Sequence, residues 1–362
     1  MIRRLVYLSG LAILGVVLFH AAGMGFVAMF AWAPRYASPG GPQPAGLAAY
    51  YFLRVLEQAA VVGVPAFLCV SGFFVAIATG RTRRAIAWQA VGKRIQYLVI
   101  PYLLWSLAAY ALRFLEGQRY SPGDILAGLV VGRANPVFYF VPLVIQLYLL
   151  SPFMAPPARN RWKLLLAVTG AMTLAVQLSW YPVFWGGRPL PWAVPSWFFP
   201  AKVFWMALGM VLGFHAREFG DFLVRRRAWL LAAALVCIPL GVAEWEVYVR
   251  AAAPSWLAHT ETLIDTLYSL AFILAYLGYS ESAVPGDAAL SFLGSNAFGI
   301  YLTHAMAIEY GARLIYRYGP MLLGEPFLLQ PLFVCLGLGV PLTLMALVRL
   351  TRLRAWRVYI FG

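Results

Sequence analysis

The first apolar run of the chain restricts the possible folds more than any other feature. It extends from Leu5 to Trp32 and is interrupted only by His20. A helix of about 20 apolar residues can cross the hydrocarbon core of a bilayer, and this run is longer. It also exceeds the apolar part of a secretory signal peptide, which has about 7–15 residues. We therefore interpret it as a retained membrane-spanning helix.

Similar runs fill most of the 362 residues, of which 62% are hydrophobic and only 11% are charged. Soluble domains contain about 25% charged residues, so this composition excludes a water-soluble globule. The runs lack the two-residue alternation that is typical of barrel strands. We expect an all-α, polytopic bundle, because a helix satisfies its own backbone hydrogen bonds in lipid. Residues 1–362 are interpreted as a single integral membrane domain.

Ten spans can be drawn from the hydropathy pattern, each near the length that a bilayer requires. They cover residues 5–29, 59–79, 95–113, 137–155, 162–181, 197–215, 228–248, 261–280, 289–312 and 327–349. The connections at 33–50 and 182–196 are rich in Pro and Gly, which predicts irregular loops. Arg54 and Glu57 precede the second span in an amphipathic stretch, for which we expect a position along the outer membrane interface.

The basic residues fall in alternate connections of this drawing. They concentrate at 3–4, 81–94, 159–163, 217–227 and 349–357. Because cationic loops stay in the cytoplasm, both termini are predicted to be cytoplasmic, as an even number of spans requires. The net charge of +15, from 28 Lys and Arg against 13 Asp and Glu, has the same explanation. It predicts contact with anionic membrane lipid and no nucleic-acid partner.

Several other classes of site have no support in the sequence. The three cysteines, Cys69, Cys237 and Cys335, lie in apolar runs, so no disulfide framework is expected. No His, Cys, Asp or Glu cluster has the spacing of a metal site. A phosphate-binding loop of the Gly-x-x-x-x-Gly-Lys type is also absent. We therefore expect no metal, no permanently bound cofactor and no ATP-driven transport by this chain alone.

Two of the four histidines lie deep inside apolar runs. His20 is about 22 Å along a helix that starts near Leu5, and His304 is at a similar depth if its helix starts near Ala289. Ionisable groups at such depth are candidates for function, and a neutral imidazole is the commonest general base. A hydrogen bond between helices is the structural alternative. His215 and His259 are interpreted as solvated or interfacial histidines.

A buried base of this kind favours one type of reaction. The Gly-x-Ser-x-Gly elbow of serine hydrolases is absent, and Ser295 is interpreted as a residue that starts a helix. A base without nucleophile or metal suits proton abstraction from a hydroxyl that attacks an activated acyl donor. An acyl-CoA donor would bring phosphates, for which the basic loop supplies Arg81, Arg83, Arg84, Lys93 and Arg94. The alternative is that this loop only sets the topology.

Five segments in order resemble the acyltransferase 3 family of integral membrane acyltransferases. Residues 8–20 are similar to its opening helix, 65–74 to its Ser-Gly-Phe segment, and 93–105 to its basic, then Ile-Pro-Tyr, third span. Residues 138–152 resemble its Trp-Phe…Leu-Tyr-Leu segment, and 299–304 its late Gly-Ile-Tyr-Leu-x-His segment. The likeness covers residues 5 to about 350.

The resemblance implies an O-acyltransferase of the bacterial cytoplasmic (inner) membrane. Such an enzyme moves an acyl group, often acetyl from the co-substrate acetyl-CoA, to hydroxyls of cell-envelope saccharides or lipid-linked sugars. The first-span histidine of the family maps onto His20, and its late histidine maps onto His304. With these roles, His20 is the general base, His304 orients His20 or the acyl carbonyl, and the basic loop guides the donor.

The chain departs from the family pattern at two places. Ser9 stands where the family usually has an arginine, eleven residues before the first-span histidine, so the usual contact to the donor phosphates is in question. The nearest replacement is Arg4. In the fourth-span motif, Val137 stands where a histidine is often found, and Tyr139 replaces the tryptophan.

Two other interpretations stay open on the residues alone. The first is a proton-coupled transporter or flippase of a saccharide or lipid, with the histidines as proton relays. A relay usually also needs buried carboxylates, and the candidates are Glu57, Glu244, Glu246, Asp265 and Glu309. The second is another class of membrane acyltransferase with one buried histidine, against which the ordered motifs argue.

Overall fold

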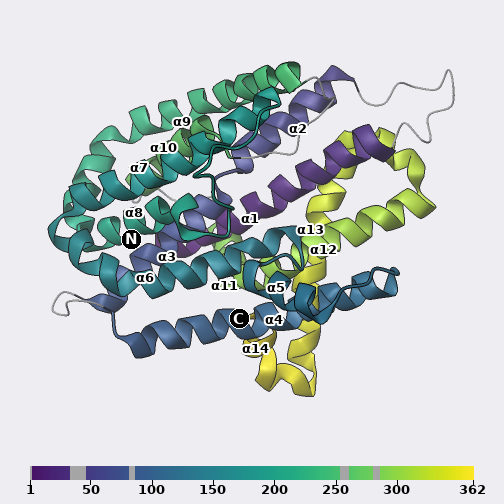
Figure 1. Ribbon diagram of the computed structural model, residues 1–362, viewed down its shortest axis with the longest axis horizontal. Helices are drawn as coiled ribbons and strands as arrows, with labels where there is room; N and C mark the ends of the chain where they lie inside the picture. Colours follow the sequence, from purple (N-terminus) through teal and green to yellow (C-terminus); the bar gives the residue numbers. More distant parts are fainter. Residues whose placement is uncertain (1, 33–45, 81–85, 253–260, 280–285) are drawn as a thin grey trace. The chain divides into compact units, whose positions relative to one another are not determined.

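The computed structural model of the chain (Figure 1) describes residues 2–32, 46–80, 86–252, 261–279 and 286–362. Every regular element in these ranges is a helix, as an all-α protein requires. By length and composition, seven helical segments can cross a membrane: Arg4–Trp32, Leu47–Thr79, Trp88–Leu115, Pro136–Asn160, Trp162–Trp185, Ala216–Ala251 and Pro326–Leu350. The apolar helices Pro122–Val131, Val203–Phe214 and Leu263–Gly278 are shorter. The total of ten spans and the orientation of the termini stay predictions.

The α-helices follow in chain order and carry the labels of Figure 1. They are α1 (Ile2–Val27), α2 (Leu47–Ala60), α3 (Gly63–Thr79), α4 (Trp88–Leu115), α5 (Pro122–Val131), α6 (Phe140–Asn160), α7 (Trp162–Trp180), α8 (Val203–Phe214), α9 (Ala216–Ala252), α10 (Leu263–Gly278), α11 (Asp287–Ser295), α12 (Ala297–Tyr318), α13 (Pro326–Leu350) and α14 (Arg357–Phe361). A π-helical turn, Ala28–Trp32, extends α1. Short 3-10 turns lie at Pro136–Tyr139, Tyr181–Trp185, Phe199–Ala201, Pro320–Gly324 and Arg352–Trp356.

The chain divides into two compact units, each of which is described by itself. The first unit contains Met1–Val64, Tyr181–Arg188 and Leu223–Ala346. The second contains Pro65–Trp180, Pro189–Phe222 and Leu347–Gly362. Helices α3, α9 and α13 each contribute residues to both units.

Helix α1 is the centre of the first unit, where α2, α11 and α12 pack against it. Its contact with α11 is backbone to backbone, because a Cβ atom at Gly10 would overlap the carbonyl oxygen of Leu290. A Cβ atom at Gly294 would overlap the carbonyl oxygen of Val6 in the same way. The two pairs run in opposite order, so α1 and α11 are antiparallel. Small residues at these positions allow close helix packing, as is common in membrane proteins.

The second unit uses the same principle between α3 and α8. A Cβ atom at Gly72 would overlap the carbonyl oxygen of Met206, and one at Gly209 would overlap that of Cys69. The C-terminal helix α14 packs on α4, where the indole nitrogen of Trp105 donates to the carbonyl oxygen of Ile360 at 2.8 Å. Cys69 is therefore a packing residue on the α3–α8 contact, as its apolar sequence context indicates.

The span predicted at 289–312 is wrong, because this segment forms two helices. Helix α11 ends at Ser295 and α12 begins at Ala297, with Asn296 between them. The Asn296 side-chain amide donates to the carbonyl oxygen of Phe292 at 2.7 Å, which satisfies an acceptor that the ended helix leaves open. Ser295 is the last residue of α11 and bonds back to Ser291, so it does not start a helix.

Arg54 and Glu57 lie on α2 with buried side chains, and their position along the outer membrane interface stays a prediction. Helix α2 begins at Leu47, inside the connection predicted as a loop. Arg54 donates to Glu57 at 2.9 Å. Its guanidinium lies over the rings of Phe26 and Trp245, with ring centroids at 4.5 and 5.3 Å. A buried partner for each charge replaces the water that burial removes.

Two further differences concern boundaries. The span predicted at 197–215 contains an α-helix only from Val203, because Pro200 lies in a preceding 3-10 turn.

Helix α5 was not predicted, although a capping box marks its start. The Ser121 side chain accepts from the Asp124 backbone, the Asp124 carboxylate accepts from the Ser121 backbone, and Gly132 ends the helix with a φ of 78°.

Candidate functional site

The two candidate histidines lie side by side in the first unit. The predicted depth of His304 is wrong, because its helix begins at Ala297 and not near Ala289, so that the residue is about 10 Å along α12. His20 on α1 and His304 on α12 have ring centroids 5.2 Å apart, with an angle of 49° between the planes. His304 is completely buried and His20 is half-buried. The rings are 284 residues apart in the chain, so only packing of α12 on α1 brings them together.

The hydrogen bonds of His304 define which of its nitrogens is basic. Its Nδ1 lies 2.8 Å from the carbonyl oxygen of Tyr301 and 3.1 Å from that of Ile300. A carbonyl oxygen only accepts, so Nδ1 carries the hydrogen and Nε2 keeps the lone pair of the neutral ring. Nε2 is buried and has no hydrogen-bond partner among the described residues. The ring therefore offers one free basic nitrogen.

The immediate surroundings of the pair are aromatic. Phe19 meets His20 edge to face at a centroid distance of 5.4 Å, and Tyr301 lies 6.0 Å from His304. In the described part of the chain, neither imidazole forms an ion pair with a carboxylate. A neutral imidazole keeps a lone pair on one ring nitrogen, and this nitrogen can accept a proton from a hydroxyl.

The five basic residues expected to guide an acyl-CoA donor differ in their exposure and contacts. Arg81, Arg83 and Arg84 lie outside the described residues. Lys93 is exposed on α4, whereas Arg94 turns inward in the second unit. Arg94 donates to the carbonyl oxygen of Phe74 at 3.2 Å and lies 5.5 Å from the ring centroid of Tyr148.

One guanidinium nitrogen of Arg94, Nη1, is buried and has no hydrogen-bond partner among the described residues. The rest of the side chain is held by α3 and α6, which fixes the direction of this free nitrogen. Arg94 is thus the described member of the basic loop that can present a fixed donor group to an anion. Lys93, on the exposed side of the same turn, can only add charge.

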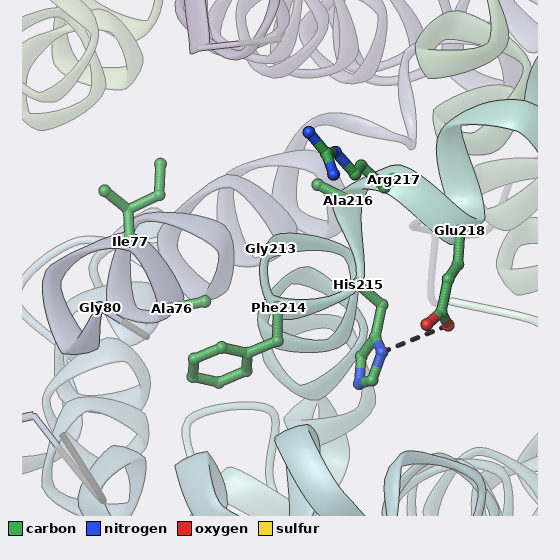
Figure 2. Close-up of a pocket in the computed structure, with 9 residues that line it drawn as sticks. All are labelled: Ala76, Ile77, Gly80, Gly213, Phe214, His215, Ala216, Arg217 and Glu218. Atoms are coloured by element: carbon green, nitrogen blue, oxygen red, sulfur yellow. Dashed lines mark ion pairs between the residues drawn. The ribbon is translucent and has the colours of Figure 1, made fainter. Parts of the chain in front are cut away.

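A pocket of about 340 Å³ lies elsewhere, in the second unit (Figure 2). Its walls come from the end of α3, the end of α8 and the start of α9. His215 bonds Glu218 at 3.4 Å through Nδ1, and its Nε2 faces the carbonyl oxygen of Arg159 at 3.1 Å. Arg217 points away from this pair in Figure 2. The sequence did not predict this pocket, since His215 was interpreted only as a solvated or interfacial histidine.

The positions that depart from the family pattern have local partners. Ser9 bonds the carbonyl oxygen of Leu5 within α1, at 3.1 Å. Arg4, the nearest replacement for a missing arginine, is mostly buried and has its guanidinium 5.8 Å from the ring centroid of Tyr276 on α10. Val137 is buried in a 3-10 turn.

The carboxylates considered for a proton relay are all engaged elsewhere. Glu57 pairs with Arg54, and Asp265 forms a capping box with Thr262 at the start of α10. The others accept from tyrosines or an arginine: Glu244 from Tyr181 and Tyr248, Glu246 from Tyr50, and Glu309 from Arg313. Their contacts are those of structural groups, which gives the transporter interpretation no support.

Comparison with known proteins identifies the family of the chain. A family model described as an acyltransferase domain, that of acyltransferase 3, matches residues 3–349, nearly the whole chain. The match includes both histidines, Lys93 and Arg94. No curated protein and no solved structure matches the chain.

Proposed function

Because the chain belongs to the acyltransferase 3 family and is a membrane acyltransferase, we propose that it is an O-acyltransferase with an acyl-CoA donor. The acyl group is acetyl, and the donor arrives from the cytoplasm. The acceptor is a hydroxyl of a cell-envelope saccharide or a lipid-linked sugar. This assignment places the protein in the cytoplasmic membrane of a bacterium.

The observation that carries the proposal is the contact between His20 and His304, with one buried basic nitrogen left free. In the reaction, His20 takes the proton of the acceptor hydroxyl as its oxygen attacks the thioester carbonyl. A C–O bond forms and the C–S bond breaks. The imidazolium then returns the proton to the departing CoA sulfur. Nε2 of His304 accepts a hydrogen bond from His20 or from the hydroxyl and orients the attack.

Arg94 and Lys93 supply the charge for the donor. An arginine held by neighbouring helices presents its free nitrogen in a fixed direction, which suits a phosphate oxygen. Since charge attraction at an exposed face is screened by salt, donor binding should weaken as ionic strength rises. A phosphate-free thioester such as N,S-diacetylcysteamine provides the matched control, because it carries the same acetyl group without the phosphates.

The first test is thermal stabilisation of the detergent-purified protein by acetyl-CoA, compared with free CoA and ATP. Ligands that bind the native state raise the apparent Tm by mass action. We expect a shift that is specific to CoA species in both the wild type and His20→Ala, and acetyl transfer only by the wild type. Absence of both the shift and the transfer for every thioester would contradict the assignment.

A further inference from the structure

Gln330 on α13 is the most unusual polar side chain of the first unit. It is only 2% exposed, and both its Nε2 and its Oε1 are buried without a hydrogen-bond partner among the described residues. Gln58, another buried amide of this unit, differs because its Nε2 donates to Asp265 at 2.8 Å. In the part of the chain that the structure describes, Gln330 alone has two such atoms.

Burial of an amide without hydrogen bonds is unfavourable, and native proteins rarely leave such groups unpaired. A leucine at this position would bury no unpaired polar atom. Retention of an unpaired amide at the expense of stability is typical of functional sites. Since Gln330 offers one donor and one acceptor, a hydroxyl is a suitable partner, because it can accept from Nε2 and donate to Oε1.

The position of Gln330 connects it to the histidine pair through α1. A Cβ atom at Gly25 would lie 3.3 Å from Gln330 Nε2 and 3.1 Å from a methyl group of Leu53, so the amide reaches the backbone of α1. Gly25 follows His20 by five residues, a rise of about 7.5 Å along the helix. The unpaired amide therefore lies between one and two turns of α1 beyond His20, toward the C-terminal end of the helix.

Two side chains with unpaired polar atoms thus face neighbouring turns of one helix. One is the fully buried His304, whose Nε2 is free, and the other is Gln330. We infer that Gln330 binds a second hydroxyl of the acceptor while His20 deprotonates the first. The acceptor class is then a polyol such as a sugar ring, and not a simple alcohol. The inference rests on the proposed acyl transfer and makes Gln330 a specificity-determining residue.

Kinetics with two acceptors test this role in the full-length, detergent-purified protein. Acetyl-CoA is the donor, and the acceptors are methyl α-D-glucopyranoside, which has several hydroxyls, and 1-propanol, which has one. We expect Gln330→Leu to raise the KM for the glycoside about tenfold, the effect of one lost buried hydrogen bond, and to leave the 1-propanol rate unchanged. Equal effects on both acceptors, or none, would overturn the inference.

Stability provides a readout that does not depend on turnover. Without ligand, Gln330→Leu should unfold at the same temperature as the wild type or higher, because it removes an unpaired buried amide. The glycoside should raise the Tm of the wild type and not that of the variant. Ser269→Ala is the matched control, since Ser269 is buried on α10 with its hydroxyl also unpaired among the described residues.

The outcomes separate the two proposals. If the wild type transfers no acetyl group, but the glycoside raises the Tm of the wild type and not that of Gln330→Leu, the proposed reaction is wrong and the hydroxyl-binding site is supported. If transfer occurs and Gln330→Leu lowers the Tm without a change in acceptor preference, Gln330 is a structural group and the inference fails.

Discussion

Two buried polar regions border the C-terminal half of α1 in the first unit, and they differ in whether their charged and basic groups have partners. In the satisfied region, around α2, α9 and α10, each charged group has a partner: Arg54 with Glu57, Glu246 with Tyr50, and Asp265 with Gln58 and Thr262. Single atoms of Gln58, Glu244 and Ser269 in this region also lack a partner among the described residues. Around His20, His304 and Gln330, basic and amide atoms stay unpaired among the described residues. Both regions contain side chains that are at most 2% exposed, such as Arg54 and Gln330, so burial alone does not distinguish them.

The difference indicates separate uses of buried polarity. A network of paired charges stabilises one arrangement of helices, because breaking a pair leaves an uncompensated charge. An unsatisfied set is ready to bind a ligand that completes its hydrogen bonds. Substitutions in the first region should therefore change stability, and substitutions in the second should change activity.

The largest expected effect is on catalysis. His20→Ala should reduce acetyl transfer by about 10²–10⁴-fold, the usual contribution of a general base. Its Tm should stay close to that of the wild type, because the ring has no charged partner among the described residues. Single-turnover release of CoA measures the rate. Normal envelope acylation by a well-expressed His20→Ala protein would show that the unsatisfied region is not catalytic.

The next largest effect is on stability. Glu57→Leu leaves the buried Arg54 guanidinium without its carboxylate, and should reduce the free energy of unfolding by about 3–5 kcal/mol. The matched control is Glu309→Leu. This substitution breaks the ion pair of Glu309, which is 34% exposed, with Arg313, which is 43% exposed. It should reduce the free energy of unfolding by about 0–1 kcal/mol. Thermal unfolding in detergent compares the two, and equal losses would remove the distinction between the pairs.

A smaller loss is expected at the start of α10. Thr262→Ala removes the side chain that accepts from the Asp265 backbone, and should cost about 1 kcal/mol. Acetyl transfer per folded molecule should stay unchanged, because this capping box belongs to the satisfied region. A strong loss of turnover with an unchanged Tm would instead indicate that Asp265 takes part in proton transfer, as the transporter interpretation requires.

The smallest expected effect is on the KM for the glycoside, and it tests whether Gly25 lies at the edge of the unsatisfied region. Gly25→Ala places a methyl group 3.3 Å from Gln330 Nε2, so the amide must shift by a few tenths of an ångström. We expect the KM for methyl α-D-glucopyranoside to rise severalfold, with little change in Tm. Gly23→Ala on the same helix is the control, since no atom lies within 4 Å of its added methyl group. Identical kinetics for both variants would argue against a glycoside near Gln330.

Much of the helical content was predictable, because long apolar runs without charge can only satisfy their backbones as helices in lipid. The run from Leu5 to Trp32 and the run near 327–349 match α1 and α13 within a few residues. The break at Asn296 was not predicted, since the residue that caps α11 lies in an apolar segment of ordinary hydropathy. The buried state of Arg54 was also missed, because its ring partners come from α1 and α9.

The sequence by itself determined the helical class, the family resemblance and the choice of His20 and His304 as candidate bases. These follow from local properties: the length of an apolar run, the order of motifs, and the cost of an imidazole in lipid. Only the tertiary structure decided that the two rings meet, which nitrogen of His304 is free, and that Gln330 is unpaired. Those facts depend on contacts between residues up to 284 positions apart, which no local pattern encodes.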